Sequence, residues 1–171
     1  SGEGEISVLQ FWGCDVYKMM LKSYNGGNME LIPDETKRGN VMLENKLGIT
    51  SSAELAREEE RISKKKAMEL FEKGILDNLP AGKFSTLQVI HKYLFESIYD
   101  FAGKIRTVNI AKSNFRFAPL IYLEAALENI DNMSQSDFDE IVEKYVEMNI
   151  AHPFREGNGR STRIWLDCIF K

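Results

Sequence analysis

A polar cluster between two apolar helical segments constrains the fold of this 171-residue chain more than any other feature. The cluster, "HPFREGNGRSTR" at 152–163, follows the amphipathic segment 137–151 and leads directly into the apolar run "IWLDCIF". Because proline cannot continue a helix, Pro153 predicts that the first helix ends at or just before His152. The Gly-Asn-Gly turn then predicts a tight loop, with a second helix beginning near Arg160.

Helical patterns cover most of the chain after residue 50. The segment 50–74 starts with candidate N-cap residues and ends at a glycine, and its charged middle predicts a solvated face without a functional role. Apolar residues recur at helical spacing through 85–103, and we expect further helices at 120–132 and 137–151.

One segment, "RTVNIAKSNFRFAP" at 106–119, shows the alternation of a strand. Val108 and Ile110 alternate with polar residues before a Lys-Ser-Asn turn, and Phe115 and Phe117 alternate after it. This pattern predicts a short hairpin. The expected fold class is therefore all-α with one short β-hairpin.

Charge and hydropathy exclude several kinds of partner. The formal net charge is −4, and no basic stripe of the kind that nucleic-acid binders carry is visible. No apolar run approaches the length of a membrane-spanning helix, so we expect neither a nucleic-acid nor a membrane partner. The first residues, "SGEGEIS", lack the features of a secretory signal, and we interpret Cys14 and Cys168 as reduced thiols. These features predict a cytoplasmic protein.

Residues 1–41 differ in character from the remainder of the chain. An apolar stretch is followed there by turn-forming residues, and Ser1 and Gly2 resemble the remnant of a cleaved tag. We interpret 1–41 as an N-terminal extension, a tag or a linker of unknown role, and 42–171 as the functional domain.

His152 is the first candidate catalytic residue. It is one of two histidines, and its expected position at a helix end beside a loop lets an imidazole accept a proton from an attacking hydroxyl. The alternative is a hydrogen-bonded structural histidine. We choose that interpretation for His91, which lies within the apolar stripe of its own segment.

The residues after His152 predict an anion site. Gly157 and Gly159 flank an asparagine, which lets successive backbone N–H groups turn towards one point, and the following helix adds its positive end. Arg160 and Arg163 are three residues apart on that helix and suit phosphate oxygens.

Glu156 is an acid inside this predicted anion site. It would repel phosphate unless a divalent ion lay between them, so it predicts Mg²⁺ bridging carboxylate and phosphates. The alternative is that Glu156 pairs with Arg155 or Arg160 at the surface. Base, anion site and metal together indicate phosphoryl or nucleotidyl transfer.

The polar cluster resembles the signature of the Fic family, H-x-F-x-[D/E]-G-N-G-R-x-x-R, without a departure. The matching residues are His152, Phe154, Glu156, Gly157, Asn158, Gly159, Arg160 and Arg163. The resemblance extends over roughly 42–171, and it includes "YLFESIYDFAGKIR" and the segment "NIAKSNFRFAP" at 109–119, which resembles the hairpin of the family and is called the flap below.

The resemblance implies an enzyme that transfers AMP from ATP to a Tyr, Thr or Ser hydroxyl of a target protein and releases pyrophosphate. His152 would then deprotonate the hydroxyl, and Glu156 would hold Mg²⁺ on the phosphates. The backbone N–H groups that surround the phosphates would come from Gly157, Asn158 and Gly159. Arg160 would grip the phosphates, and Arg163 would secure the γ-phosphate or pair with an inhibitory glutamate.

The flap would bind the target protein through main-chain hydrogen bonds along an exposed edge. The residues expected to clamp the target are Lys112, Ser113, Asn114 and Phe115. The alternative is a hairpin that only covers the core. Self-modification is a further expectation.

Two points qualify the implied activity. Family members also remove AMP, or transfer phosphoryl, UMP or phosphocholine groups, and a non-catalytic helical interaction module is the alternative of another class. The inhibitory pattern of many bacterial members, Ser or Thr with a glutamate four positions later and then Gly or Asn, does not occur. We therefore expect the chain to be truncated at its C-terminus, with the inhibitory glutamate beyond it.

Overall fold

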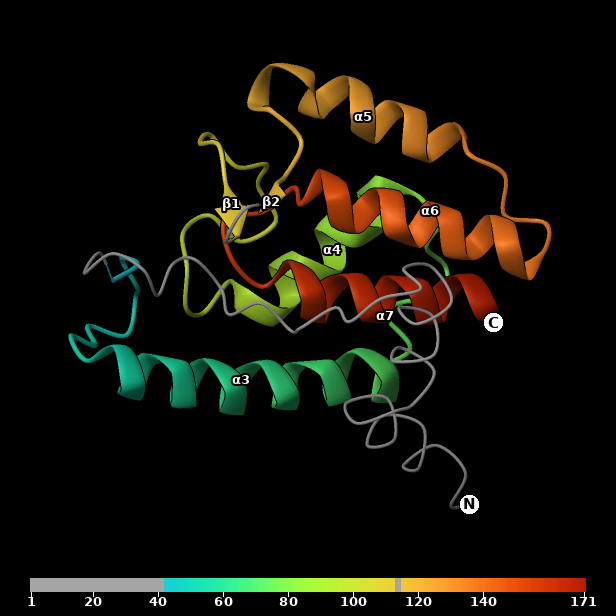
Figure 1. Ribbon diagram of the computed structural model, residues 1–171. Coiled ribbons are helices and arrows are strands. Elements are labelled where there is room, and N and C mark those ends of the chain that lie inside the picture. Colours follow the sequence, from blue (N-terminus) through green and yellow to red (C-terminus); the bar gives the residue numbers. More distant parts are fainter. Residues whose placement is uncertain (1–41, 113–114) are drawn as a thin grey trace, which may run out of the picture. The chain divides into compact units, whose positions relative to one another are not determined.

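The structure is a computed structural model that describes residues 42–112 and 115–171 (Figure 1). The predicted extension 1–41 lies outside the described residues, as do Ser113 and Asn114 of the flap, so the domain boundary at residue 42 stays a prediction.

Five helices and one two-stranded hairpin form the described part of the chain, which confirms the predicted fold class. With the labels of Figure 1, the elements are α3 (Ser52–Glu72), α4 (Phe84–Phe95), β1 (Ala111–Lys112), β2 (Phe115–Arg116), α5 (Leu120–Asn132), α6 (Phe138–Ala151) and α7 (Asn158–Phe170). None of these helices is both long and apolar enough to cross a bilayer.

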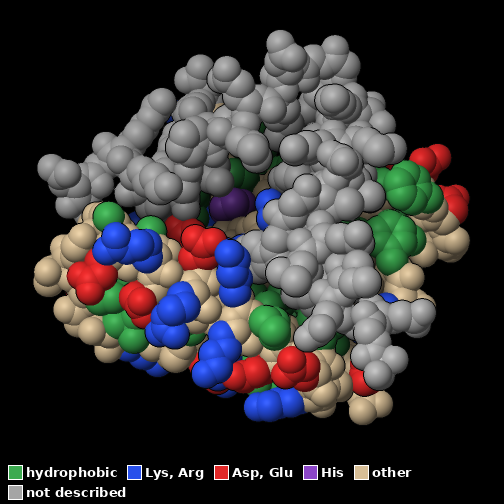
Figure 2. All heavy atoms as spheres, turned by 90° about the horizontal axis from the view of Figure 1, so that it is seen from below, with side chains coloured by type: hydrophobic (Ala, Val, Ile, Leu, Met, Phe, Trp, Pro, Cys, Tyr) green, Lys and Arg blue, Asp and Glu red, His purple; other side chains and the backbone are tan. Residues whose placement is uncertain are grey.

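Helix α3 begins where its capping residue predicts. The side chain of Ser51 accepts a hydrogen bond from the backbone N–H of Glu54, and Gly74 follows the last turn with a positive φ of 62°. Acidic and basic side chains are interspersed over the surface seen in Figure 2. Within α3, the Arg61 guanidinium lies 2.7 Å from the Glu58 carboxylate. Most of the charged middle of α3 is thus a solvated face, but Glu69 accepts a hydrogen bond from the Tyr93 hydroxyl at 3.0 Å, and Glu59 is described below.

Helix α4 is shorter than its apolar pattern predicts. It ends at Phe95, yet Ile98 and Tyr99 beyond it are as deeply buried as the helix itself. The chain turns back instead, and the backbone N–H of Gly103 donates to His91 Nδ1 at 2.9 Å. Because this turn keeps the same apolar side chains inward, the sequence pattern continues after the helix has stopped.

The helices pack in a chain of neighbours around α4. Helix α4 contacts α3, α5 and α7, α7 contacts α6, and α6 contacts α5 (Figure 1). The largest fully buried side chains include Phe95, Phe154, Leu123 and Trp165, whose indole Nε1–H donates to the carbonyl oxygen of Lys83 at 2.9 Å. This core holds both sides of the 152–163 cluster, because α6 ends and α7 begins on it.

The flap is an antiparallel ribbon in which Ala111 pairs with Arg116 and Lys112 with Phe115. Its strands have two residues each, so the predicted hairpin is present but shorter than the alternation suggests. Val108 precedes the first strand and is 41% exposed.

Candidate active site

His152 terminates α6 in an unusual backbone conformation. Its φ is 48°, and it is the single non-glycine residue with positive φ among the described residues. Its backbone N–H donates to the carbonyl oxygen of Met148 at 3.1 Å, and Pro153 prevents a further turn of helix. A left-handed non-glycine residue costs about 1 kcal/mol or more, so neighbouring contacts must maintain it.

The His152 imidazole packs against the flap. Its ring lies 3.8 Å from the ring of Phe117, centroid to centroid, with 12° between the planes. The structure therefore brings the predicted base to the segment predicted to bind the target. The predicted clamp residue Phe115 is 45% exposed and contacts Phe117 edge to face.

Asn158 closes the loop on itself. Its side-chain oxygen accepts from the backbone N–H of Phe154 at 2.8 Å, and its amide nitrogen donates to the Phe154 carbonyl at 2.7 Å. Phe154 is fully buried and stacks on His91 at 3.8 Å. The amide side chain thus fixes the loop, which leaves only the backbone N–H of Asn158 for a ligand.

Gly157 is the N-cap of α7, and no side chain caps this helix in the described part of the chain. Its φ is 76°, and an added Cβ would lie 2.4 Å from Cε2 of Phe95. A Cβ on Gly159 would meet nothing within 4 Å. Helix geometry leaves the first N–H groups of α7 without intrahelical acceptors, and the positive end of the helix dipole lies at the same place.

His91 supports this loop from the core, which confirms its structural interpretation. Because Nδ1 accepts from Gly103, Nε2 carries the hydrogen and donates to the carbonyl oxygen of Glu156 at 2.7 Å. Burial lowers the pKa of the His91 imidazole to about 4, so the ring is neutral near pH 7.

The Glu156 carboxylate accepts from the Gly157 backbone N–H at 3.1 Å and lies 3.5 Å from Nη2 of Arg160. The alternative interpretation anticipates the pairing with Arg160 but places it at the surface, whereas the two side chains are largely buried. No cluster of three or more His, Cys, Asp or Glu side chains suited to a metal occurs within the described ranges. A cation beside Glu156 would need oxygen ligands from a substrate or from water.

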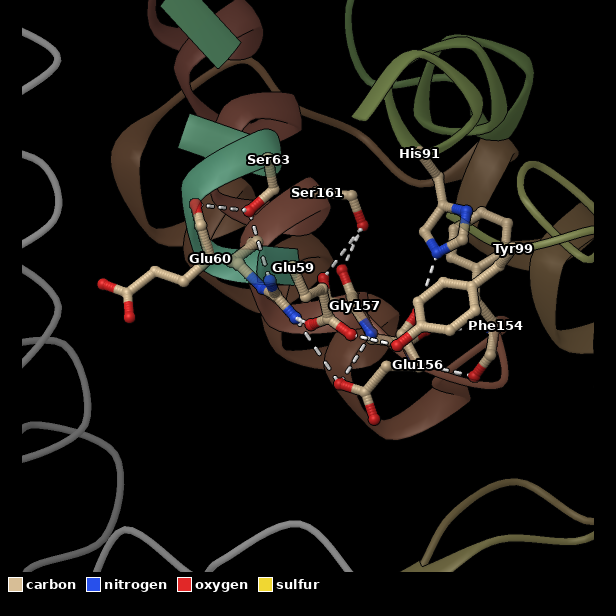
Figure 3. Close-up of polar contacts among 11 residues, drawn as sticks. Glu59, Glu60, Ser63, His91, Tyr99, Phe154, Glu156, Gly157 and Ser161 are labelled. Atoms are coloured by element: carbon tan, nitrogen blue, oxygen red, sulfur yellow. Dashed lines mark hydrogen bonds and ion pairs between the residues drawn. The ribbon is translucent and has the colours of Figure 1, made fainter. Parts of the chain in front are cut away.

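Arg160 faces helix α3. Its guanidinium donates to the Glu59 carboxylate and to the Ser63 hydroxyl, the latter at 3.2 Å, and lies 4.9 Å over the ring of Phe95. Figure 3 shows the side chains of Glu59, Ser63 and Glu156 converging on one region. The role of Arg160 in binding phosphates stays a prediction, and in this structure its guanidinium is bonded to Glu59 and Ser63 of α3. Arg163 is half-buried on the next turn of α7.

Sequence reasoning missed Glu59 and Tyr99. Glu59 is 8% exposed and receives a hydrogen bond from the Tyr99 hydroxyl, in addition to its pairing with Arg160 (Figure 3). Burial and this carboxylate raise the pKa of Tyr99, which stays protonated. Glu59 occupies the buried stripe of α3, which is Leu55, Glu59, Ser63, Ala67 and Leu70. An acid at such a position is the signal that could have found it.

Comparison with known proteins identifies relatives of the chain. The Fic/DOC family model matches residues 83–170. Protein adenylyltransferase VbhT of Bartonella schoenbuchensis is 33% identical over 85% of this chain and 32% of its own length. The probable protein adenylyltransferase y4lH of Sinorhizobium fredii is 29% identical over 77% of this chain and 71% of its own. The chain thus spans about a third of VbhT.

Solved structures share the fold. The BepC protein of Bartonella tribocorum with bound AMPPNP matches 80% of this chain and 77% of its own, with a TM-score of 0.61 and 20% identity. The N-terminal Fic domain of a Bep effector from Bartonella sp. AR 15-3 matches 84% of this chain and 74% of its own, with a TM-score of 0.63 and 24% identity. Since the family model also matches more than half of its residues, the chain belongs to the Fic/DOC family.

Proposed function

We propose that the chain is a protein adenylyltransferase, which moves AMP from ATP to a hydroxyl side chain of a target protein and releases pyrophosphate. One observation carries the proposal: a single short loop joins the imidazole of His152 to the N-terminus of α7, which no side chain caps in the described residues. Relatives named protein adenylyltransferase support the choice of reaction.

His152 acts in this proposal as the general base. Its ring lies against Phe117 of the flap, so a target segment along the flap would present its hydroxyl near the imidazole. Loss of that proton makes the oxygen a nucleophile for the α-phosphorus of ATP, and pyrophosphate leaves from the opposite side.

The start of α7 binds the phosphates. The backbone N–H groups of Asn158 and Gly159 lie in the first turn, and the absence of side-chain bulk at Gly159 lets a phosphate approach the backbone closely. Arg163 supplies a positive charge one turn later. Arg160 contributes charge from its position against α3, and a direct contact with phosphate requires its guanidinium to turn from Glu59.

Glu156 is the residue that would hold Mg²⁺. A carboxylate next to a phosphate site fits this ion, which takes one or two carboxylates and completes its shell with phosphate oxygens and water. When bound, Mg²⁺ neutralises charge on the phosphates. The Arg160 guanidinium, 3.5 Å away, keeps the carboxylate on the side of the loop where α7 begins.

The protein partner would bind along the flap. A two-stranded ribbon has outer edges with backbone groups available for pairing, and Phe115 offers an exposed apolar contact. Lys112, Ser113 and Asn114 complete the proposed clamp. A bacterial source and a cytoplasmic location belong to the same proposal, supported by the bacterial sources of the relatives and by the free thiol of Cys168.

ATP labelled in the α-phosphate or in the γ-phosphate tests the proposal. With Mg²⁺ and candidate target protein, only the α-label should become attached to protein, and His152→Ala should abolish the attachment. Transfer of the γ-label would indicate a kinase, and neither label on any protein would contradict adenylyl transfer. Removal of Mg²⁺ with EDTA should abolish attachment of the α-label to protein as completely as His152→Ala does.

A further inference from the structure

Arg106 is a buried guanidinium at the end of α6. It is 4% exposed, and its Nε–H donates to the carbonyl oxygen of His152 at 2.7 Å. One terminal nitrogen also donates to the carbonyl of Ala151 at 3.1 Å. Carbonyl groups in the last turn of a helix have no intrahelical donor, and the dipole there favours a cation, so Arg106 caps α6 in both respects.

The same guanidinium contacts the flap on both sides. Its Nη1 donates to the carbonyl of Val108 at 2.8 Å, directly before the flap, and its Nη2 donates to Ala118 at 2.5 Å, where the flap returns. The backbone N–H of Arg106 adds a bond to the carbonyl of Pro153 at 2.8 Å. One side chain therefore joins the start and end of the flap to the residue that carries the imidazole.

Within the described residues the Arg106 guanidinium has no counter-ion. The four groups that accept its hydrogen bonds are all backbone carbonyl oxygens. A planar guanidinium can serve four acceptors at fixed angles, whereas the ammonium of lysine has three donors on a flexible stem. The arrangement thus depends on geometry as well as on positive charge.

The flap in turn fixes the imidazole. Phe117, next to Ala118, stacks on the His152 ring at 3.8 Å, and the Ala118 backbone N–H donates to the carbonyl of Ile150 at 3.0 Å. His152, with its positive φ, thus has the flap contacts on one side and the Arg106 hydrogen bonds on the other. Backbone and ring of His152 are therefore held from two sides by groups that Arg106 connects.

We propose that Arg106 is a positioning residue that keeps His152 and the flap in one fixed arrangement. It acts through His152 and does not itself touch substrate. Its effect on catalysis rests on the proposed function, whereas its effect on the imidazole does not. With Arg106 intact, the base and the bound target segment keep a constant separation.

The imidazole signals in an NMR spectrum test the positional part without any activity assay. The chain has two histidines, and His152→Ala assigns their signals. In wild type, the stacked Phe117 ring should shield the His152 ring protons. In Arg106→Lys and in Arg106→Gln the His152 signals should move towards their free values, while those of His91, stacked on Phe154 at 3.8 Å, should not. Unchanged His152 signals in both variants would overturn the proposal.

The wild-type protein provides a second measurement should both variants fail to fold. The Arg106 Nε–H should exchange with solvent slowly, because it is buried and bonded to His152. Rapid exchange would overturn the proposal. Arg116→Lys, at an exposed position in β2, is the control variant and should leave both histidine signals in place.

Steady-state kinetics test the catalytic part. Arg106→Lys should lower kcat for α-label transfer at least tenfold, with KM for ATP changed less than twofold, because Asn158 and His91 hold the phosphate loop independently. A rise in KM for ATP as large as the fall in kcat would contradict a positioning role, and so would an unchanged kcat. If wild type transfers no α-label, the proposed function fails, and the NMR measurements still decide the role of Arg106.

Discussion

At the scale of single residues, Gly157 is restricted to glycine by two separate constraints. Its φ of 76° disfavours any side chain, and a Cβ would lie 2.4 Å from the Phe95 ring, which is fully buried and cannot move aside cheaply. Gly159, two residues later, has neither constraint. The two glycines of one motif thus serve different purposes.

Gly157→Ala should therefore destabilise the protein, whereas Gly159→Ala should not. We expect a loss of at least about 1–2 kcal/mol for Gly157→Ala from the backbone alone, with the ring contact adding to it. The measurement is urea unfolding at pH 7. Equal stabilities of the two variants would show that the Phe95 contact is relieved without cost.

His91 should make stability depend on pH. Its folded pKa of about 4 lies below the unfolded value of about 6.5, so the unfolded chain binds the proton first as pH falls. The contribution of neutral His91 is complete above pH 6.5 and is lost as pH falls towards 4. Over that window the loss should be roughly 3 kcal/mol, at 1.4 kcal/mol per pH unit.

Urea unfolding of wild type and of His91→Gln at pH 7 and pH 4.5 measures this effect. The variant lacks the titrating group, so the difference between its two stabilities should be smaller than that of wild type. An identical pH dependence in both proteins would mean that other groups cause the loss.

The residue-scale predictions from sequence succeeded where side-chain type and spacing determine the outcome. His91 is structural, as its place in the apolar stripe of its own segment predicts. Glu59 and Arg106 escaped notice because their partners are distant in sequence: Arg160 for the first, and the backbone carbonyls of the flap and α6 for the second. The sequence around Glu59 and Arg106 therefore does not identify these partners.

At the scale of secondary-structure elements, α3 is joined to the start of α7 by a largely buried ion pair. The side chains of Arg160 and Glu59 are 19% and 10% exposed. Tyr99 and Ser63 bond to the same pair, so most of its hydrogen-bonding capacity is filled. Helix α3 thereby holds the Arg160 side chain near the start of α7.

Glu59→Gln should destabilise the protein by about 2–3 kcal/mol, because it leaves the Arg160 charge with a weaker partner in a dry environment. Thermal and urea unfolding measure the loss. Glu58→Gln is the matched control: it is the neighbouring residue, and its exposed pair with Arg61 should contribute almost nothing. A similar response of both variants would exclude a special role for Glu59.

Element boundaries followed the sequence only where a terminator is local. Helix α5 has the predicted bounds, since Pro119 precedes it, and α3 starts at its serine cap. The end of α4 was wrong by several residues, because the apolar pattern runs on through a turn held by His91. Such a stop depends on a tertiary contact.

At the scale of the whole molecule, the described part of the chain is a helical body that brings a flap, a helix end and a helix start to one loop. The fold class and the family could be predicted, because the motif is dense and its residue types are chemically specific. The contact of Arg160 with Glu59 could not be predicted, since it depends on how α3 packs against α4.

A crystal structure with a non-hydrolysable ATP analogue and Mg²⁺ tests the central claim most directly. We expect the phosphates at the first turn of α7, within hydrogen-bond distance of the Asn158 and Gly159 backbone N–H groups, with the metal beside Glu156 and the α-phosphate facing the His152 imidazole. A nucleotide bound elsewhere on the protein, or an α-phosphate turned from that imidazole, would contradict it.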